Sequence, residues 1–254
     1  MGFELNDRVM ALNVQLESFM DKHIYPREHD WHEWCLDQDK LWTTPPWYDE
    51  LRALAKEEGL WNLFLPHEYQ PWSPGLTNVE IAPLFETMSK VSWAQSVFNC
   101  NAPDRGNMEV LAKYGTEAQQ KEWLEPLLAG EIRSAYAMTE PQVASSDATN
   151  MELEIKRDGD EYVLNGRKWW TTGAVNPRCK VMLVMGKSNP ENPRHRQHST
   201  ILVPRDTPGI TLVRELRVFD SLHSPAGEAE LLFEDVRVPV TNMIKGEGRG
   251  FEIA

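Results

Sequence analysis

The stretch "ELEIKRDGDEYVLNGRKWWTTG", residues 152–173, decides the fold class of the second half of this chain. Apolar residues alternate with charged residues at its start, as in a strand that buries one face. Asp158-Gly159-Asp160 is a turn signal, and Asn165-Gly166 favours a second tight turn. The stretch therefore predicts a three-stranded meander whose third strand runs over residues 167–172.

Short runs of β-branched and aromatic residues continue beyond the meander. Further strands are expected at residues 181–185, 200–203, 210–213, 229–233 and 236–238. So many short strands without alternating helices indicate a β-barrel or sandwich and argue against a doubly wound α/β sheet.

The first 130 residues instead show helical spacing and helical caps. One amphipathic face collects apolar residues at intervals of three and four, namely Val9, Leu12, Leu16, Phe19 and Met20. A second helix is expected with Thr44 as N-cap, Pro45 at its first position and Gly59 as its stop. Two more helices are expected after capping boxes, which are formed by Thr77 with Glu80 and by Thr116 with Gln119. Pro126 is expected to bend the second of these helices.

Composition limits the function. The 254 residues carry a formal charge of −13, which argues against nucleic acid and anionic membranes as general partners. No apolar run approaches the roughly 20 residues that span a bilayer, and no signal or transit peptide is evident, so a cytoplasmic protein is expected. The three cysteines are scattered, the seven histidines are dispersed, and neither a metal site nor a GxSxG nucleophile is predicted.

Two segments contain polar and aromatic groups that could bind a ligand. "YAMTEPQVASSDATN", residues 136–150, is crowded with hydroxyl groups, and its loop offers backbone N–H groups. "KWWTTG", residues 168–173, sets two indoles beside two hydroxyls, which suits a flat redox-active ring. A capped surface turn explains the first segment equally well, and alternation along a strand would bury Trp169 or Trp170 in the core. Together the segments favour a ligand site.

Three longer blocks add a resemblance to a known family. Residues 112–150, residues 164–174 ("LNGRKWWTTGA") and residues 233–251 ("FEDVRVPVTNMIKGEGRGF") resemble the flavin-dependent acyl-CoA dehydrogenases. "WNLFLP" and "VFNCNAPDRGNMEVL" are similar to the branch of family members ten and eleven. The resemblance implies an α+β multidomain protein: an all-α domain over residues 1–133, a β-barrel or sandwich domain over 134–243, and at 244–254 the start of a C-terminal helical domain that is otherwise absent.

The resemblance also implies an FAD site. Tyr136, Met138 and Thr139 match the strand that binds the flavin edge, and Trp170 and Thr172 match the pair that packs on the ring and hydrogen-bonds near N5. Thr171 between them contributes backbone.

The loop after Pro141 is one residue longer than the family pattern, so Ser145 and Ser146 compete for one role. We expect Ser145 on the flavin and Ser146 on the acyl-CoA. The basic run at residues 192–198 is interpreted as a solvated loop rather than a coenzyme A site.

The implied reaction is α,β-dehydrogenation of a fatty acyl-CoA. Electrons would pass to an electron-transferring flavoprotein, and a homodimer or homotetramer is expected. The family's catalytic base would lie beyond Ala254, so no catalytic residue is assigned. Two alternatives stay open: a related flavin-dependent oxidase, or a module that binds flavin or partners without turnover.

Overall fold

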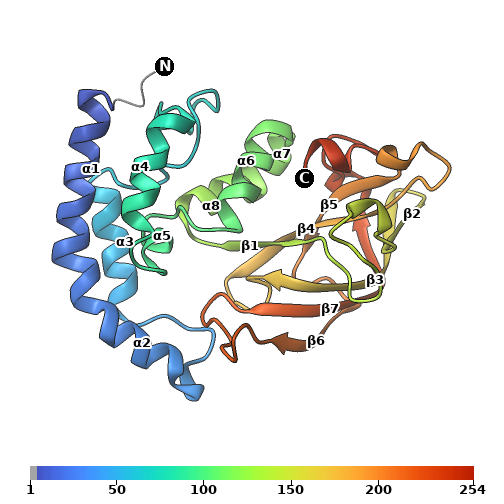
Figure 1. Cartoon of the computed structure of the whole chain (residues 1–254). Helices are drawn as coiled ribbons and strands as arrows, with labels where there is room; N and C mark the ends of the chain where they lie inside the picture. The colour runs from blue at the N-terminus through green and yellow to red at the C-terminus, as the bar shows by residue number, and fades with distance from the viewer. Residues whose placement is uncertain (1–4) are drawn as a thin grey trace. The chain divides into compact units, whose positions relative to one another are not determined.

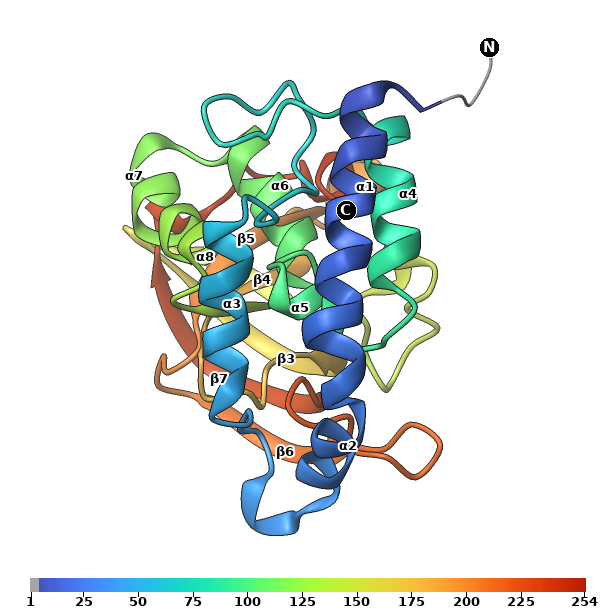
Figure 2. The ribbon, with the colours of Figure 1, turned by 90° about the vertical axis from the view of Figure 1, so that its left-hand side faces the viewer.

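The computed structural model describes residues 5–254, which belong to two compact units divided between Arg105 and Gly106. The first unit is helical. Its helices are α1 (Asp7–Phe19), α2 (Glu28–Leu36), α3 (Trp47–Glu57), α4 (Asn78–Met88) and α5 (Ala94–Val97), and α6 (Asp104–Tyr114) begins at its end. Helices α1 and α4 lie side by side in both views of the ribbon (Figure 1, Figure 2).

The core of the first unit follows the predicted helical stripes. Val9, Leu16 and Phe19 of α1 are buried, as are Leu84 and Met88 of α4. Burial of such side chains supplies the main driving force for packing the helices together. The capping box that precedes α4 is present as predicted.

The start of α3 differs from the prediction. The helix begins at Trp47 with Pro46 as its N-cap, rather than after Thr44. Two prolines in a row explain the shift, because a residue that precedes a proline is kept out of the helical region. Pro45 therefore cannot open the helix, and the helix starts only after Pro46.

The second unit opens with α6, followed by α7 (Glu117–Gln119), a π-helical turn (Gln120–Leu124) and α8 (Glu125–Ala129). The predicted capping box of Thr116 and Gln119 is present. The hydrogen-bond pattern changes at the π-helical turn just before Pro126, which has no N–H to donate.

A curled mixed sheet of seven strands makes up the rest of this unit. The strands are β1 (Arg133–Ala137), β2 (Glu154–Asp158), β3 (Glu161–Thr172), β4 (Cys179–Lys187), β5 (His198–Pro204), β6 (Ile210–Leu216) and β7 (Glu228–Pro239). Their order is β1-β4-β2-β3-β7-β6, with β5 paired to β4. One face buries a continuous apolar core that includes Leu164, Val184, Ile201 and Phe233.

The predicted turn at Asn165-Gly166 is wrong, because β3 runs through both residues without reversing. The partner strand β7 accounts for the asparagine, and a close contact with Leu153 accounts for the glycine. Asp235 of β7 adopts φ +50° at a register shift, and its backbone N–H and carboxylate bond the Asn165 side chain at 2.8 and 3.1 Å. A Cβ at Gly166 would lie 2.8 Å from the Cα of Leu153. The expected meander is therefore a single hairpin of β2 and β3.

The same irregularity merges two other predicted strands. Residues 229–233 and 236–238 are parts of the single strand β7, joined across the bulge at Asp235. The charged pair Glu234-Asp235 interrupts the apolar pattern there because the bulge turns these side chains to solvent.

Candidate functional site

The loop that follows β1 is a closed turn. The Ser145 hydroxyl accepts a hydrogen bond from the Glu140 backbone N–H at 2.8 Å and donates one to the Glu140 carbonyl at 3.2 Å. Ser145 is buried, whereas Ser146 is exposed. The two serines that competed in the sequence thus have different surroundings: the Ser145 hydroxyl closes the turn, and the Ser146 hydroxyl faces outward.

A buried ion pair joins this loop to β3. The Lys168 ammonium donates to a Glu140 carboxylate oxygen at 2.8 Å and to the Met138 carbonyl at 2.6 Å. The same carboxylate accepts from the backbone N–H groups of Glu152 at 2.7 Å and Leu153 at 2.8 Å. Burial lowers the pKa of Lys168 to about 8, and the charge of Glu140 acts in the opposite direction.

The two predicted segments meet directly beside this pair. The backbone N–H of Trp169 donates to the Thr139 carbonyl at 3.0 Å, and the Thr139 hydroxyl donates to the Trp169 carbonyl at 3.1 Å. The end of the Tyr136–Thr139 segment and the start of the Trp169–Thr172 segment therefore form one edge, although about 30 residues of sequence separate them.

A bulge in β3 shapes the second half of this edge. The register with β7 shifts between Lys168 and Thr171, and Trp170 adopts φ +49° within the shift. Trp170 is 41% exposed, and Trp169 is only partly buried. The expectation that simple strand alternation would bury one of these indoles in the core is therefore wrong, because the extra residue of the bulge breaks the alternation.

The hydroxyls after the bulge have different partners. Thr171 is fully buried, and its hydroxyl has no hydrogen-bond partner among the described residues. The Thr172 hydroxyl donates to a carboxylate oxygen of Glu228 at 2.7 Å. Burial raises the pKa of Glu228, while the Thr172 donor and the nearby His223 partly offset that effect. No sequence motif indicated Glu228 as a partner of Thr172, because 56 positions separate the two residues.

Tyr136 and Met138 lie in a small apolar cluster behind the loop. Both are partly buried against Ala148, Met151 and Met185. Burial raises the pKa of the Tyr136 phenol, which stays neutral over the physiological range. The two side chains pack against this cluster. Their backbone continues directly to Thr139.

The basic run at residues 192–198 is exposed over most of its length, between β4 and β5, and it contacts the loop after β1. Arg194 forms an ion pair with Asp147 at 2.7 Å and donates to the Thr149 hydroxyl at 2.7 Å. At the end of the run, His198 is buried and its Nε2 lies 3.2 Å from the Met151 carbonyl. The prediction of a solvated loop did not include the ion pair and hydrogen bonds of this run, because the run and the loop after β1 are distant in sequence.

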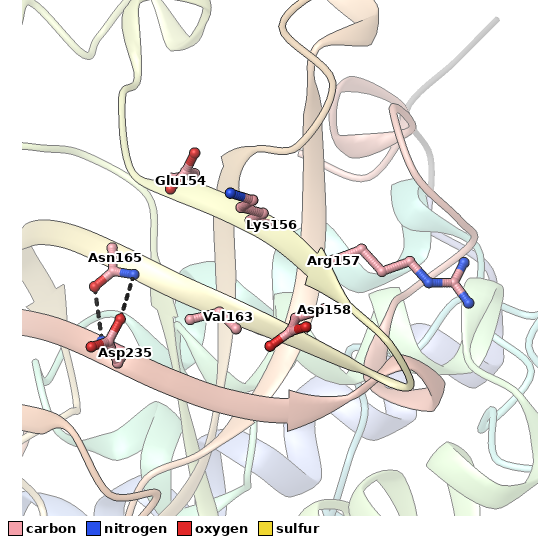
Figure 3. A pocket seen from close by; sticks show the side chains of 7 residues that line it. All are labelled: Glu154, Lys156, Arg157, Asp158, Val163, Asn165 and Asp235. Carbon is pink, nitrogen blue, oxygen red and sulfur yellow. Dashed lines mark hydrogen bonds between the residues drawn. The ribbon is translucent and has the colours of Figure 1, made fainter.

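A pocket of about 420 Å³ lies elsewhere on the sheet (Figure 3). It involves β2, β3 and β7, and none of the predicted site residues lines it. The lining residues are Glu154, Lys156, Arg157, Asp158, Val163, Asn165 and Asp235. Figure 3 shows the hydrogen bonds between Asn165 and Asp235 that belong to the β7 bulge. Both signs of charge are present, so the pocket favours no single class of ligand.

Residues 5–254 contain neither a cluster of metal ligands nor a membrane-spanning helix. No group of three or more His, Cys, Asp or Glu side chains in that range could hold a metal ion. In the same range no helix combines the length and the apolar character needed to cross a membrane.

Two family models match consecutive parts of the chain. The model described as "Acyl-CoA dehydrogenase, N-terminal domain" matches residues 7–131, and "Acyl-CoA dehydrogenase, middle domain" matches residues 135–236. Mouse acyl-CoA dehydrogenase family member 10 is 51% identical over 253 residues, which are 98% of this chain and 24% of the mouse protein. The chain thus spans about a quarter of that relative.

Solved structures share the fold of this chain. One from Mycobacterium abscessus, assigned to acyl-CoA dehydrogenases, has a TM-score of 0.94 and 47% identity, covering 98% of this chain and 63% of that chain. A glutaryl-CoA dehydrogenase from Mycobacterium smegmatis, solved in complex with FADH2, shares the fold with a TM-score of 0.70 and 23% identity over 98% of this chain and 58% of that chain.

Proposed function

Because this chain belongs to the acyl-CoA dehydrogenase family, we propose that it provides the flavin-binding part of an FAD-dependent acyl-CoA dehydrogenase. The proposed domains are a helical one over residues 1–133 and a β domain over 134–243, with residues 244–254 leading into a further helical domain. The proposed reaction is α,β-dehydrogenation of a fatty acyl-CoA to the 2-enoyl-CoA, for which bound FAD would supply the electron acceptor.

The observation that carries this proposal is the edge formed by Thr139 and the Trp169–Thr172 segment. Residues of this edge fit a flavin: the Trp170 indole, which is 41% exposed, offers a flat apolar face, and Thr139 and Thr172 supply hydroxyl groups to the same edge. Trp170 would pack on the ring, the Thr172 hydroxyl would contact it near N5, and the backbone of Tyr136, Met138 and Thr171 would support its edge.

The two serines take separate roles in this proposal. Ser145 holds the turn through both of its hydrogen bonds to Glu140, so its contribution to the flavin would come through the backbone of the loop. Ser146, whose side chain is exposed next to Asp147, would contact the acyl-CoA. No residue of this chain is assigned as the base that removes the α-proton.

The remaining partners belong to the same proposal. An electron-transferring flavoprotein would accept the electrons, and the protein would work as a homodimer or homotetramer. Fatty acid β-oxidation is the process that such a reaction serves.

A titration of FAD into the purified 254-residue chain tests the cofactor. We expect flavin fluorescence to be quenched on binding, and we expect Trp170→Ala to weaken binding about tenfold because stacking is lost. Trp34→Ala, in α2, is the matched control and should bind FAD like the wild type. Equal FAD affinity of the wild type and Trp170→Ala, or absence of binding, would contradict the proposal.

Anaerobic addition of acyl-CoAs to the FAD-loaded chain tests whether residues 1–254 contain the base that removes the α-proton. We expect binding without bleaching of the flavin band. Rapid bleaching would show that a base lies within residues 1–254.

A further inference from the structure

Glu228 and Thr172 face each other across two neighbouring strands. They are register partners in the antiparallel pair of β3 and β7, which lie side by side in both views (Figure 1, Figure 2). Their side chains therefore point to the same side of the sheet. On the other flank Glu228 is paired with Leu216 of β6, which is buried. The carboxylate thus has a fixed position beside the hydroxyl.

The hydrogen bond between them sets the direction of the Thr172 hydroxyl. The oxygens are 2.7 Å apart, and the ionised carboxylate only accepts, so the hydroxyl proton lies toward Glu228. A hydroxyl has one proton and two lone pairs. While it donates to Glu228, Thr172 can offer any other neighbour only an acceptor.

This direction matters for a flavin at the proposed edge. An oxidised isoalloxazine presents N5 as an acceptor, and a reduced one presents N5–H as a donor. A hydroxyl that can only accept complements the reduced form, and an unmatched polar pair in a partly buried site is costly.

We propose that Glu228 is a positioning residue that holds the Thr172 hydroxyl as an acceptor and so favours reduction of the bound flavin. This inference rests on the proposed function, because it requires a flavin next to Thr172. In this role Glu228 acts through the Thr172 hydroxyl, to which it is hydrogen-bonded.

The negative charge of Glu228 acts against this effect, since it disfavours electrons arriving nearby. Two neutral variants remove that complication. Glu228→Gln keeps a carbonyl oxygen that can accept from Thr172, whereas Glu228→Met has a similar length and no comparable acceptor. The difference between these variants isolates the direction of the hydroxyl.

The experiment measures the two-electron midpoint potential of each variant loaded with FAD, after its FAD dissociation constant and thermal unfolding have been recorded. We expect Glu228→Gln to hold the flavin in the reduced form about tenfold more readily than Glu228→Met. For a two-electron couple, tenfold corresponds to about 30 mV. Adding Thr172→Val to both variants should abolish the difference, because the hydroxyl is then gone.

The outcomes separate the two proposals. If all folded variants bind FAD and the two neutral variants have equal potentials, the role of Glu228 is refuted while the flavin site stands. A difference that persists with Thr172→Val would also refute it, because the effect would not pass through the hydroxyl. If the folded chain binds no FAD, the proposed function fails and this inference fails with it.

Discussion

Replacing Lys168 by methionine should strongly destabilise the second unit. The Lys168 side chain is fully buried, and its ammonium is the cation that pairs with the buried Glu140 carboxylate at 2.8 Å. In Lys168→Met the carboxylate keeps its two backbone N–H donors, from Glu152 and Leu153, but loses the opposite charge. The Met138 carbonyl also loses a donor.

The size of the effect follows from burial. Glu140 has a side-chain exposure of 4%, so water cannot replace the lost ammonium. Breaking a buried ion pair by removing one partner typically costs about 3–5 kcal/mol of the free energy of unfolding. The double variant Glu140→Gln with Lys168→Met removes both charges, and we expect it to regain at least about 1 kcal/mol relative to Lys168→Met alone.

Urea unfolding of the whole chain, followed by circular dichroism and tryptophan fluorescence, measures these differences. Lys180→Met is the matched control: Lys180 is exposed on β4, so its loss should change the free energy of unfolding by less than about 0.5 kcal/mol. The reasoning is refuted if Lys168→Met lies within about 1 kcal/mol of the wild type, or if the double variant is no more stable than Lys168→Met.

Three further predictions concern the same unit. Burial lowers the pKa of His198 below its usual 6.5, so the unfolded chain binds a proton that the folded chain resists. Stability should therefore fall below about pH 6.5, and less steeply in His198→Gln; identical pH profiles in urea unfolding would contradict this. Gly166→Ala should cost more than about 2 kcal/mol in thermal unfolding because the added Cβ would meet the backbone of Leu153, whereas Gly159→Ala, with open space around its Cβ, should cost about 1 kcal/mol. Ser145→Ala should lower the free energy of unfolding by about 1–3 kcal/mol because the turn loses both of its hydrogen bonds, whereas Ser146→Ala should lower it by less than about 0.5 kcal/mol. A larger loss for Ser146→Ala in calorimetry would show that Ser146, and not Ser145, holds the turn.

Features that depend on neighbours in sequence could be predicted from the sequence. The capping boxes at Thr77 and Thr116 join residues three positions apart, so their residue types alone indicate the contact, and both are present. The division into helices first and strands second follows in the same way from hydrophobic spacing, which each segment carries by itself.

Predictions failed where a distant partner decides the geometry. Asn165-Gly166 has the composition of a tight turn, yet its asparagine bonds a bulge at Asp235, 70 residues away. Trp170 lies in a left-handed conformation because the pairing with β7 contains an extra residue there. No local rule distinguishes such a bulge from an ordinary strand.

For the candidate site, the sequence by itself determined which two segments carry hydroxyl and indole groups, and the family resemblance assigned their residues to a flavin. Only the tertiary structure decided how the segments meet. The pairs Glu140–Lys168 and Thr172–Glu228 join residues 28 and 56 positions apart. Such contacts depend on the order and register of strands, which many distant residues set together. The residue type determines which hydrogen bonds and ion pairs a side chain can form, and the fold determines which partner lies within reach.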